Sequence, residues 1–254
     1  MATVEEIFGF LCELAPVETQ MDFDNAGFLV GHSDAKVGRA IAALDITDEV
    51  IQEAIDSDAQ LIISHHPVVW GSLRAVTDTG SGRKTLRLAE SGIAVICMHT
   101  NLDIAPGGVN DALLAVLGID GEGALDKHGC GRFGRLEPGM ELRDFLALCK
   151  SRLGANGLRY YDAGKRAERV AVMGGAGGDA VEDAFRKGCD TYVTADIKYH
   201  EFLLARELGL NLIDAGHYPT ENPVIPVISA LLAQRFPETE FIVSRRHRQI
   251  VSFA

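Results

Sequence analysis

The sequence is poor in basic residues and cysteines and has no long apolar run, and each shortage excludes a class of protein. Its 24 Lys and Arg stand against 36 Asp and Glu, which leaves a formal charge of -12. Such a charge opposes attraction to nucleic-acid phosphates and to anionic membrane surfaces. The one basic cluster, RRHR at 245–248, is expected to be a solvated strand end. We therefore expect neither nucleic acid nor a membrane as a partner.

The first residues, MATVEEIFGFLCELAP, contain neither a basic stretch nor an uninterrupted apolar one, so a secretory signal is not expected. No window approaches the roughly 20 apolar residues that span a bilayer, and the cytoplasm is the expected location. The five cysteines are widely spaced and form no CxxC pair. This spacing indicates free thiols rather than a disulfide framework or a thiolate metal site.

Two common catalytic sequences are also missing, because neither a GxSxG turn nor a Walker A loop occurs. GAGGDA, residues 175–180, does fit G-x-G-x-x-A, and Asp196 follows about where a dinucleotide fold has its ribose-binding acid. Any glycine-rich turn from a strand to a helix can match this pattern, however. Close packing of the strand and helix is the preferred interpretation, and binding of a nicotinamide or flavin cofactor is the alternative.

What the sequence does have is an alternation of apolar, strand-length runs with amphipathic helical segments, which is typical of α/β proteins. The 254 residues, 47% of them hydrophobic, suffice for a sizeable core. We predict two linked α/β lobes with mostly parallel sheets. The first lobe would comprise residues 1–125 with 212–254 and the second 126–211, and the polar stretch 120–134 is predicted to link them.

The predicted strands of the first lobe are continuous apolar runs, as expected for strands that are covered on both faces. Because predicted helices alternate with these strands, the strands should pair in parallel with right-handed crossovers. Strands are predicted at 40–46, 61–66, 93–100, 158–162, 169–175, 191–196, 211–217 and 240–244, and helices at 3–16, 48–58, 83–92, 109–119, 141–154, 179–188, 198–209 and 222–236.

Three predicted strands end in side chains that can bind a metal ion, at the edge of a parallel sheet where ligands commonly bind. These side chains are His65 with His66, His99 with Asp103, and His217 with Glu221. Pro67 favours a turn, which would let two adjacent histidines share one site. Pro219 argues against a helix through 217–221, and Thr220 is predicted to be the N-cap of the last helix.

Imidazoles and carboxylates together suit zinc, iron or manganese better than calcium or magnesium. Five such ligands exceed what one tetrahedral ion with an open position requires, whereas two ions that share a carboxylate would use them all. Structural roles are the alternative. A histidine at a strand end is often only hydrogen-bonded, Asp103 could cap a turn, and Glu221 could interact with a helix dipole.

Five segments between residues 23 and 222 resemble, in order, the Nif-three-like family, whose members carry the name GTP cyclohydrolase type 1, type 2 homologue. They are FDNAGFLVG (23–31), ISHHPVVW (63–70), HTNLDIAPGGVNDALLAVLG (99–118), TADIKYHEF (194–202) and DAGHYPTEN (214–222). The resemblance is to the compact bacterial form, because the chain is too short for the domain that longer relatives insert between the lobes. Phe23 and the following AGF are conservative departures, since tryptophan and VGL are usual in that family.

The resemblance implies two divalent metal ions per chain, bound by His65, His66, Asp103, His217 and Glu221. It also implies a ring-shaped homohexamer, a trimer of dimers, with the metal sites facing an internal cavity. His99 matches the family's pattern without belonging to this ligand set, so we expect it to orient a ligand or a bound water.

The family's name implies a hydrolase that acts on a small-molecule nucleotide, opening the imidazole ring of GTP with loss of formate, and metal ions suit such chemistry. His99, Tyr199 and His200 are the candidate proton shuttles.

A hypothesis of a different class is a non-catalytic metal-binding or regulatory interaction protein, as the words "interacting factor" in the name of relatives suggest. The polar residues Asp24, Asn25, Lys198 and Tyr199 favour an enzyme, which has to position a substrate. A ring that threads nucleic acid ranks last because of the negative charge.

Overall fold

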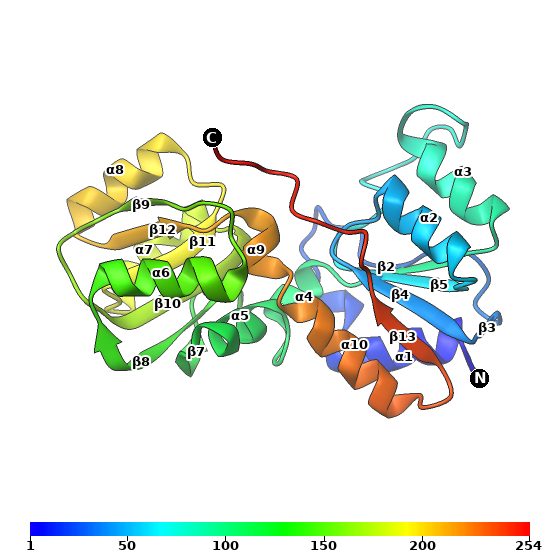
Figure 1. The fold of residues 1–254 in the computed structure, drawn as a ribbon, viewed down its shortest axis with the longest axis horizontal. Helices are drawn as coiled ribbons and strands as arrows, with labels where there is room; N and C mark the ends of the chain where they lie inside the picture. Colours follow the sequence, from blue (N-terminus) through cyan, green and yellow to red (C-terminus); the bar gives the residue numbers. More distant parts are fainter. The chain divides into compact units, whose positions relative to one another are not determined.

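The protein's structure, a computed structural model, describes residues 1–254 and divides the chain into two compact units (Figure 1). Unit 1 comprises Met1–Ala105 and Ile225–Arg248, and unit 2 comprises Pro106–Val224 and Gln249–Ala254. Each unit is a sheet covered by helices, so the predicted α/β class is confirmed. The units differ from the predicted lobes at the segments 106–125, 212–224 and 249–254, which all belong to unit 2.

Unit 1 is built on a five-stranded sheet in the order β13-β4-β5-β6-β2. Its strands are β2 (Gly27–Val30), β4 (Arg39–Ala43), β5 (Leu61–Ser64), β6 (Ala94–Cys97) and β13 (Glu240–Val243). The first four in that order are parallel, as predicted, and β2 is antiparallel to β6. Ala43 pairs with Ser64 and Ser64 with Cys97, so three consecutive strands end level with one another. The residues that follow them therefore leave the sheet at one edge.

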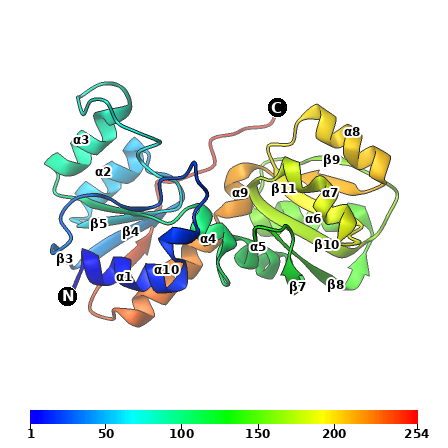
Figure 2. The ribbon, with the colours of Figure 1, turned by 180° about the vertical axis from the view of Figure 1, so that it is seen from behind.

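The apolar strands of unit 1 are covered on both faces. Figures 1 and 2 show α2 (Asp48–Asp56) and α3 (Arg83–Glu90) on one face of the sheet, and α1 (Val4–Leu14) and α10 (Val224–Arg235) on the other. Thr3 starts α1 with a capping box, in which its hydroxyl accepts from the Glu6 N–H while the Glu6 carboxylate accepts from the Thr3 N–H. Unit 1 also contains two short 3-10 helices, η1 (Val17–Thr19) and η2 (Gly80–Gly82). A separate two-stranded sheet is formed by β1 (Ala2–Thr3) and β3 (Lys36–Val37).

Unit 2 has a six-stranded mixed sheet in the order β7-β8-β10-β11-β12-β9. Its strands are β7 (Asp120–Ala124), β8 (Arg132–Met140), β9 (Arg159–Tyr161), β10 (Ala167–Ala176), β11 (Thr191–Ala195) and β12 (Asn211–Asp214). Only the β10-β11 and β11-β12 pairs are parallel. The short helix α9 (His217–Glu221) follows β12 directly. The remaining helices of unit 2 are α5 (Val109–Leu117), α6 (Leu142–Leu153), α7 (Val181–Arg186), α8 (Tyr199–Leu208) and the 3-10 helix η3 (Gly178–Ala180).

Side chains of alternating direction along the strands of unit 2 form two separate cores. Val170 and Val172 pack with residues of α5 and α6 in one core, whereas Ala171 packs with residues of α7 and α8 in the other. Leu113 of α5 belongs to the first core, which explains why this helix is part of unit 2.

The stretch 120–134 forms paired antiparallel strands rather than the predicted link between lobes. Gly134 lies so close to the backbone of Asp120 that a side chain at Gly134 would collide with it. The glycines that suggested a loop thus serve close strand pairing.

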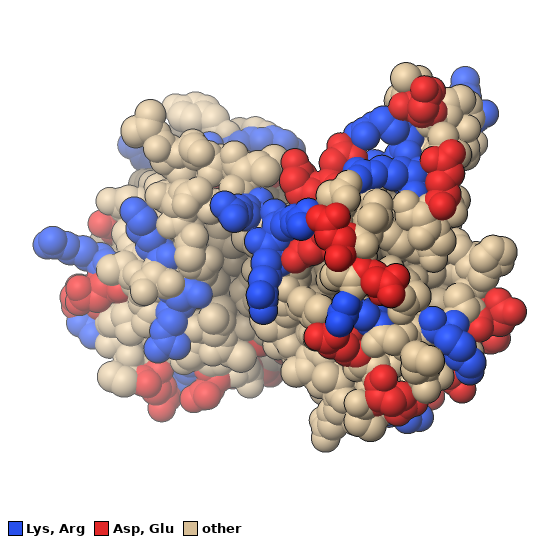
Figure 3. Space-filling model, turned by 45° about the vertical axis from the view of Figure 1, so that its right-hand side comes forward, with Lys and Arg blue, Asp and Glu red and all other residues tan.

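None of the helices combines the length and the hydropathy that a membrane-spanning segment needs. Figure 3 shows acidic and basic side chains interspersed on the face of unit 1 that it presents.

Candidate functional site

Two adjacent histidines, His65 and His66, follow β5 directly. The backbone N–H of His66 donates to the Leu44 carbonyl at 2.9 Å, and the Ser64 hydroxyl donates to the His66 carbonyl at 2.8 Å. The strand ends at Ser64, so the alternation that would send the two rings to opposite faces of the sheet no longer applies. Their ring centroids lie 5.0 Å apart.

His99 follows the next strand and joins this pair. Its ring centroid lies 5.0 Å from that of His65 and 5.3 Å from that of His66, and the potential ligand atoms of all three histidines lie within 4.8 Å of one another. This arrangement results from the level ends of β5 and β6. A cluster of three imidazoles therefore stands at the carboxyl edge of the parallel strands in unit 1.

Each imidazole of this cluster is held through its Nδ1 atom by an oxygen acceptor. The partner of His65 is the Met98 carbonyl at 2.9 Å, that of His66 is the Asp45 carboxylate at 2.7 Å, and that of His99 is the Asp24 carboxylate at 2.7 Å. A carbonyl or carboxylate can only accept, so Nδ1 carries the hydrogen and the neutral ring has its lone pair on Nε2. Metal-binding histidines are commonly oriented in this way.

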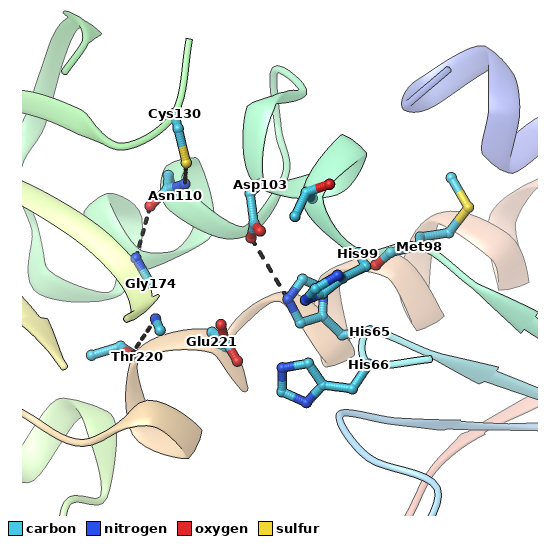
Figure 4. Close-up of polar contacts among 12 residues, drawn as sticks. His65, His66, Met98, His99, Asp103, Asn110, Cys130, Gly174, Thr220 and Glu221 are labelled. Atoms are coloured by element: carbon cyan, nitrogen blue, oxygen red, sulfur yellow. Dashed lines mark hydrogen bonds and ion pairs between the residues drawn. The ribbon is translucent and has the colours of Figure 1, made fainter. Parts of the chain in front are cut away.

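Asp103 stands opposite His65. It lies on α4 (Thr100–Ile104), the short helix that His99 precedes, and its N–H donates to the His99 carbonyl at 3.1 Å. The Asp103 Oδ1 faces the His65 Nε2 at 3.6 Å (Figure 4). Two electron-rich atoms that face each other in a buried setting favour a cation close to both. The chemistry of the donors fits a divalent metal ion.

Asp24 lies in the FDNAG segment, and its side chain is fully buried. It accepts from the His99 Nδ1, from the Thr100 N–H at 3.0 Å and from the Thr100 hydroxyl at 2.5 Å. Burial alone would raise the pKa of Asp24, but these hydrogen bonds lower it well below its usual range. The carboxylate therefore stays ionised and fixes His99, which gives this segment a role at the cluster.

Asp45, which sequence reasoning missed, follows β4 and holds two histidines. Its Oδ1 accepts from His66, and its Oδ2 is 2.9 Å from the Nε2 of His247. Burial would raise the pKa of Asp45, but hydrogen bonds to His247 and His66 lower it below its usual range. The RRHR segment is consequently more than the predicted solvated strand end, because the His247 side chain is only 5% exposed.

In unit 2, His217 and Glu221 lie on the same short helix. The His217 Nε2 is 3.1 Å from the Glu221 Oε2, and its Nδ1 is 2.7 Å from the Asp196 Oδ2. Burial would lower the pKa of His217, but Glu221 and then Asp196 raise it to about 9. Asp196 itself has a φ of 55°, which is rare for a residue other than glycine and often marks a functional site.

The helix α9 corrects the prediction that Pro219 would prevent one. Pro219 is its third residue, and the first backbone N–H groups of a helix have no partner within it, so the missing N–H costs nothing there. Thr220 is not an N-cap either. It lies inside α9, where its hydroxyl accepts from the Gly175 N–H at 3.0 Å (Figure 4).

The glycines of GAGGDA serve close packing, which was the preferred interpretation, although the side chains that they contact were not predicted. A side chain at Gly175 would collide with the Glu221 carboxylate, and one at Gly178 would collide with that of Glu201. The strand β10 can thus approach α9 closely enough to place Glu221 against its backbone.

The remaining predicted residues lie at the start of α8. Tyr199 is 78% exposed, and His200 is exposed as well. Glu201, which was not singled out, is buried and accepts from the Lys198 N–H at 2.7 Å. The structure thus brings His65, His66, His99 and Asp103 together in unit 1 and His217 with Glu221 in unit 2, and a role for Tyr199 or His200 as a proton shuttle stays a prediction.

The comparison with known families agrees with the resemblance in the sequence. Residues 2–249 match the family Duf34/NIF3 (NGG1p interacting factor 3). The chain belongs to this family.

Two curated relatives are similar to this chain over most of its length. The chain is 35% identical over 259 residues to the GTP cyclohydrolase 1 type 2 homolog of Clostridium perfringens, covering 98% of this chain and 99% of that protein. It is 36% identical to the protein of the same name from Clostridium acetobutylicum, and the match covers 90% of this chain and 89% of that protein.

Among solved structures, a hypothetical protein of Staphylococcus aureus has a TM-score of 0.93 at 28% identity, covering 99% of each chain. Reduced HcgD from Methanocaldococcus jannaschii has a TM-score of 0.82 at 28% identity, covering 95% of this chain and 97% of that one. The fold of this NIF3 family member is thus shared by distant relatives.

Proposed function

We propose that this NIF3 family member is a dinuclear metal-dependent hydrolase that acts on a nucleotide in the manner of a GTP cyclohydrolase. Its ligands would be His65, His66, Asp103, His217 and Glu221, and the ions zinc, iron or manganese. One observation carries the proposal: His65, His66 and His99 each direct Nδ1 at an oxygen acceptor, and the potential ligand atoms of the three rings lie within 4.8 Å of one another. Nε2 is then the atom that each of these rings would turn to a metal ion. The His217 Nε2 lies 3.1 Å from the carboxylate of a second proposed ligand, Glu221.

Bound divalent ions would supply a water of lowered pKa and would polarise the bond that is attacked. The chain's own residues prepare this chemistry. Asp45 and Asp24 keep the imidazoles of His66 and His99 in one tautomer and one orientation. His99 lies within the imidazole cluster but outside the proposed ligand set, so its Nε2 could accept a proton from the attacking water.

The names of the curated relatives support a nucleotide substrate, because both name a GTP cyclohydrolase. A second candidate, a non-catalytic metal-binding or regulatory protein, is favoured by the family's description as an interacting factor. For the assembly we propose a homohexamer, a trimer of dimers, which sedimentation equilibrium of the purified protein would test. A monomer or an isolated dimer at micromolar concentration would contradict it.

The metal centre can be tested by elemental analysis of protein purified without a chelator or a metal-binding tag. We expect about two ions per chain, fewer in His66→Ala and in Glu221→Ala, and the full number in a control, His32→Ala, which removes an exposed histidine. Ion-free parent protein that also fails to take up added zinc, iron or manganese would contradict the proposal.

Activity is tested separately by incubating the metal-loaded protein with GTP and measuring formate. We expect His99→Ala to keep its ions and to lose turnover, and Tyr199→Phe and His200→Ala test the exposed candidates in the same assay. Two bound ions without turnover of any nucleotide would favour the metal-binding or regulatory protein instead.

A further inference from the structure

The only tryptophan of the chain, Trp70, lies beside the imidazole cluster. Its ring centroid is 5.3 Å from that of His99, with the planes at 88°, and 6.5 Å from that of His66, with the planes at 40°. Even so, Trp70 is 57% exposed. Tryptophan is on average well buried, so an indole that is exposed beside the imidazole cluster offers an apolar surface on which a ligand can pack.

The backbone that carries Trp70 is fixed by the FDNAG segment. The Asn25 side-chain amide donates to the Val69 carbonyl at 2.8 Å, and the Asn25 N–H donates to the Asp24 Oδ1 at 2.7 Å. The same Asp24 oxygen accepts from His99. Hydrogen bonds of Asp24 and Asn25 thus connect the imidazole of His99 with the backbone that directly precedes Trp70.

We propose that Trp70 is a specificity residue whose indole stacks on the heteroaromatic ring of the substrate. This inference rests on the proposed function and narrows it. If the reaction opens a heterocycle, the ring itself has to lie beside the imidazole cluster, where Trp70 provides a flat partner. The substrate class is then a purine-type nucleoside or nucleotide bound through its base, rather than a phosphoester bound through its phosphates.

A single tryptophan makes the inference directly measurable, since all indole fluorescence comes from Trp70. Zinc-loaded protein is titrated with guanosine, which has the base and the ribose but no phosphate, with tripolyphosphate, which has phosphates alone, and with GTP. We expect guanosine and GTP to change the intensity and the emission maximum, and tripolyphosphate to change neither. A response to tripolyphosphate together with none to guanosine would overturn the proposal.

Variants separate stacking from the metal centre. In equilibrium dialysis against GTP, Trp70→Leu should weaken binding about 10-fold or more, because stacking of a base on an aromatic ring contributes on that order. Trp70→Phe should keep most of the affinity, since it retains a ring. Tyr160→Ala is the control, because it removes an aromatic side chain that is 54% exposed and lies on β9 in unit 2.

Zinc content is measured for every variant in parallel. Unchanged zinc with weakened GTP binding in Trp70→Leu supports the stacking role. Equal GTP affinity in Trp70→Leu and the parent overturns that role and leaves the metal centre standing. Parent protein that takes up none of zinc, iron and manganese overturns the proposed function, and the guanosine titration then still decides whether Trp70 binds a base.

Discussion

His66 and His247 share one carboxylate: Asp45 holds the former through Oδ1 at 2.7 Å and the latter through Oδ2 at 2.9 Å. The segment of His247 is fixed independently, because the Glu53 carboxylate accepts from the Ser244 hydroxyl at 2.5 Å and from the Arg245 N–H at 2.9 Å. A residue late in the chain thus helps to orient a proposed metal ligand that follows β5.

Replacing Asp45 should weaken metal binding although Asp45 is not a proposed ligand. We expect Asp45→Ala to lower zinc affinity about 10- to 100-fold, because His66 loses the partner that fixes its tautomer and orientation. Competition with a chromophoric chelator measures the affinity. Asp34→Ala, which removes an exposed acid elsewhere in unit 1, serves as the control, and equal zinc affinity in the two variants would contradict the role of Asp45.

Replacing Asp24 should reduce stability even without metal. Asp24→Ala leaves buried donors of His99 and Thr100 without their acceptor, so we expect a loss of about 2–4 kcal/mol in the free energy of unfolding. Urea denaturation of metal-free protein measures this loss. The exposed neighbour Asp22 provides the control, since Asp22→Ala should change stability by no more than about 0.5 kcal/mol. A similar small change in both variants would show that the Asp24 hydrogen bonds contribute little.

Gly175→Ala should displace the Glu221 side chain. Gly164→Ala is the control that measures the cost of a positive φ alone. Both glycines have a positive φ, 67° and 73°, but a side chain at Gly164 meets nothing within 4 Å, whereas one at Gly175 collides with the Glu221 carboxylate. We expect Gly164→Ala to cost about 1–2 kcal/mol through backbone strain alone. Gly175→Ala should cost more in thermal unfolding and should also lose bound metal. Equal metal content in the two variants would refute this account of Glu221.

Removing the metal should lower the thermal midpoint, because an ion that binds only the folded chain stabilises it. At a free ion concentration of about 100 times the dissociation constant, the gain is about 2.7 kcal/mol, which corresponds to roughly 5–10 °C for a chain of this size. Calorimetry before and after chelation, and again after zinc is restored, measures the shift. In the His66→Ala, Glu221→Ala double variant the chelator should have little effect, and a shift as large as in the parent would point to an ion bound elsewhere.

The local features of the site could be predicted from the sequence. Apolar runs that end in polar residues indicated where the strands stop, and parallel pairing then predicts that His65, His66 and His99 leave the sheet together, as they do. Asp45 carries the same pattern at the end of β4, so it could have been recognised from the sequence as well.

Features that depend on tertiary packing could not be predicted in this way. His247 reaches Asp45 only because β13 pairs with β4. The strand β7, of sequence DGEGA, is mostly exposed and lacks apolar alternation, so its pairing depends on β8 rather than on its own composition. The helix that contains Pro219 was rejected by a rule that applies only beyond the first turn.

The order of the strands in unit 1 has a consequence for synthesis on the ribosome. β4 pairs with β5 from early in the chain, but its other edge is covered by β13, which is translated only after all of the segment 106–224. During that interval a parallel edge strand of the nascent chain stays open, which is the kind of surface that misassociates and that chaperones bind. Completion of the sheet, and with it the arrival of His247 at Asp45, therefore waits until the segment 106–224 has been synthesised.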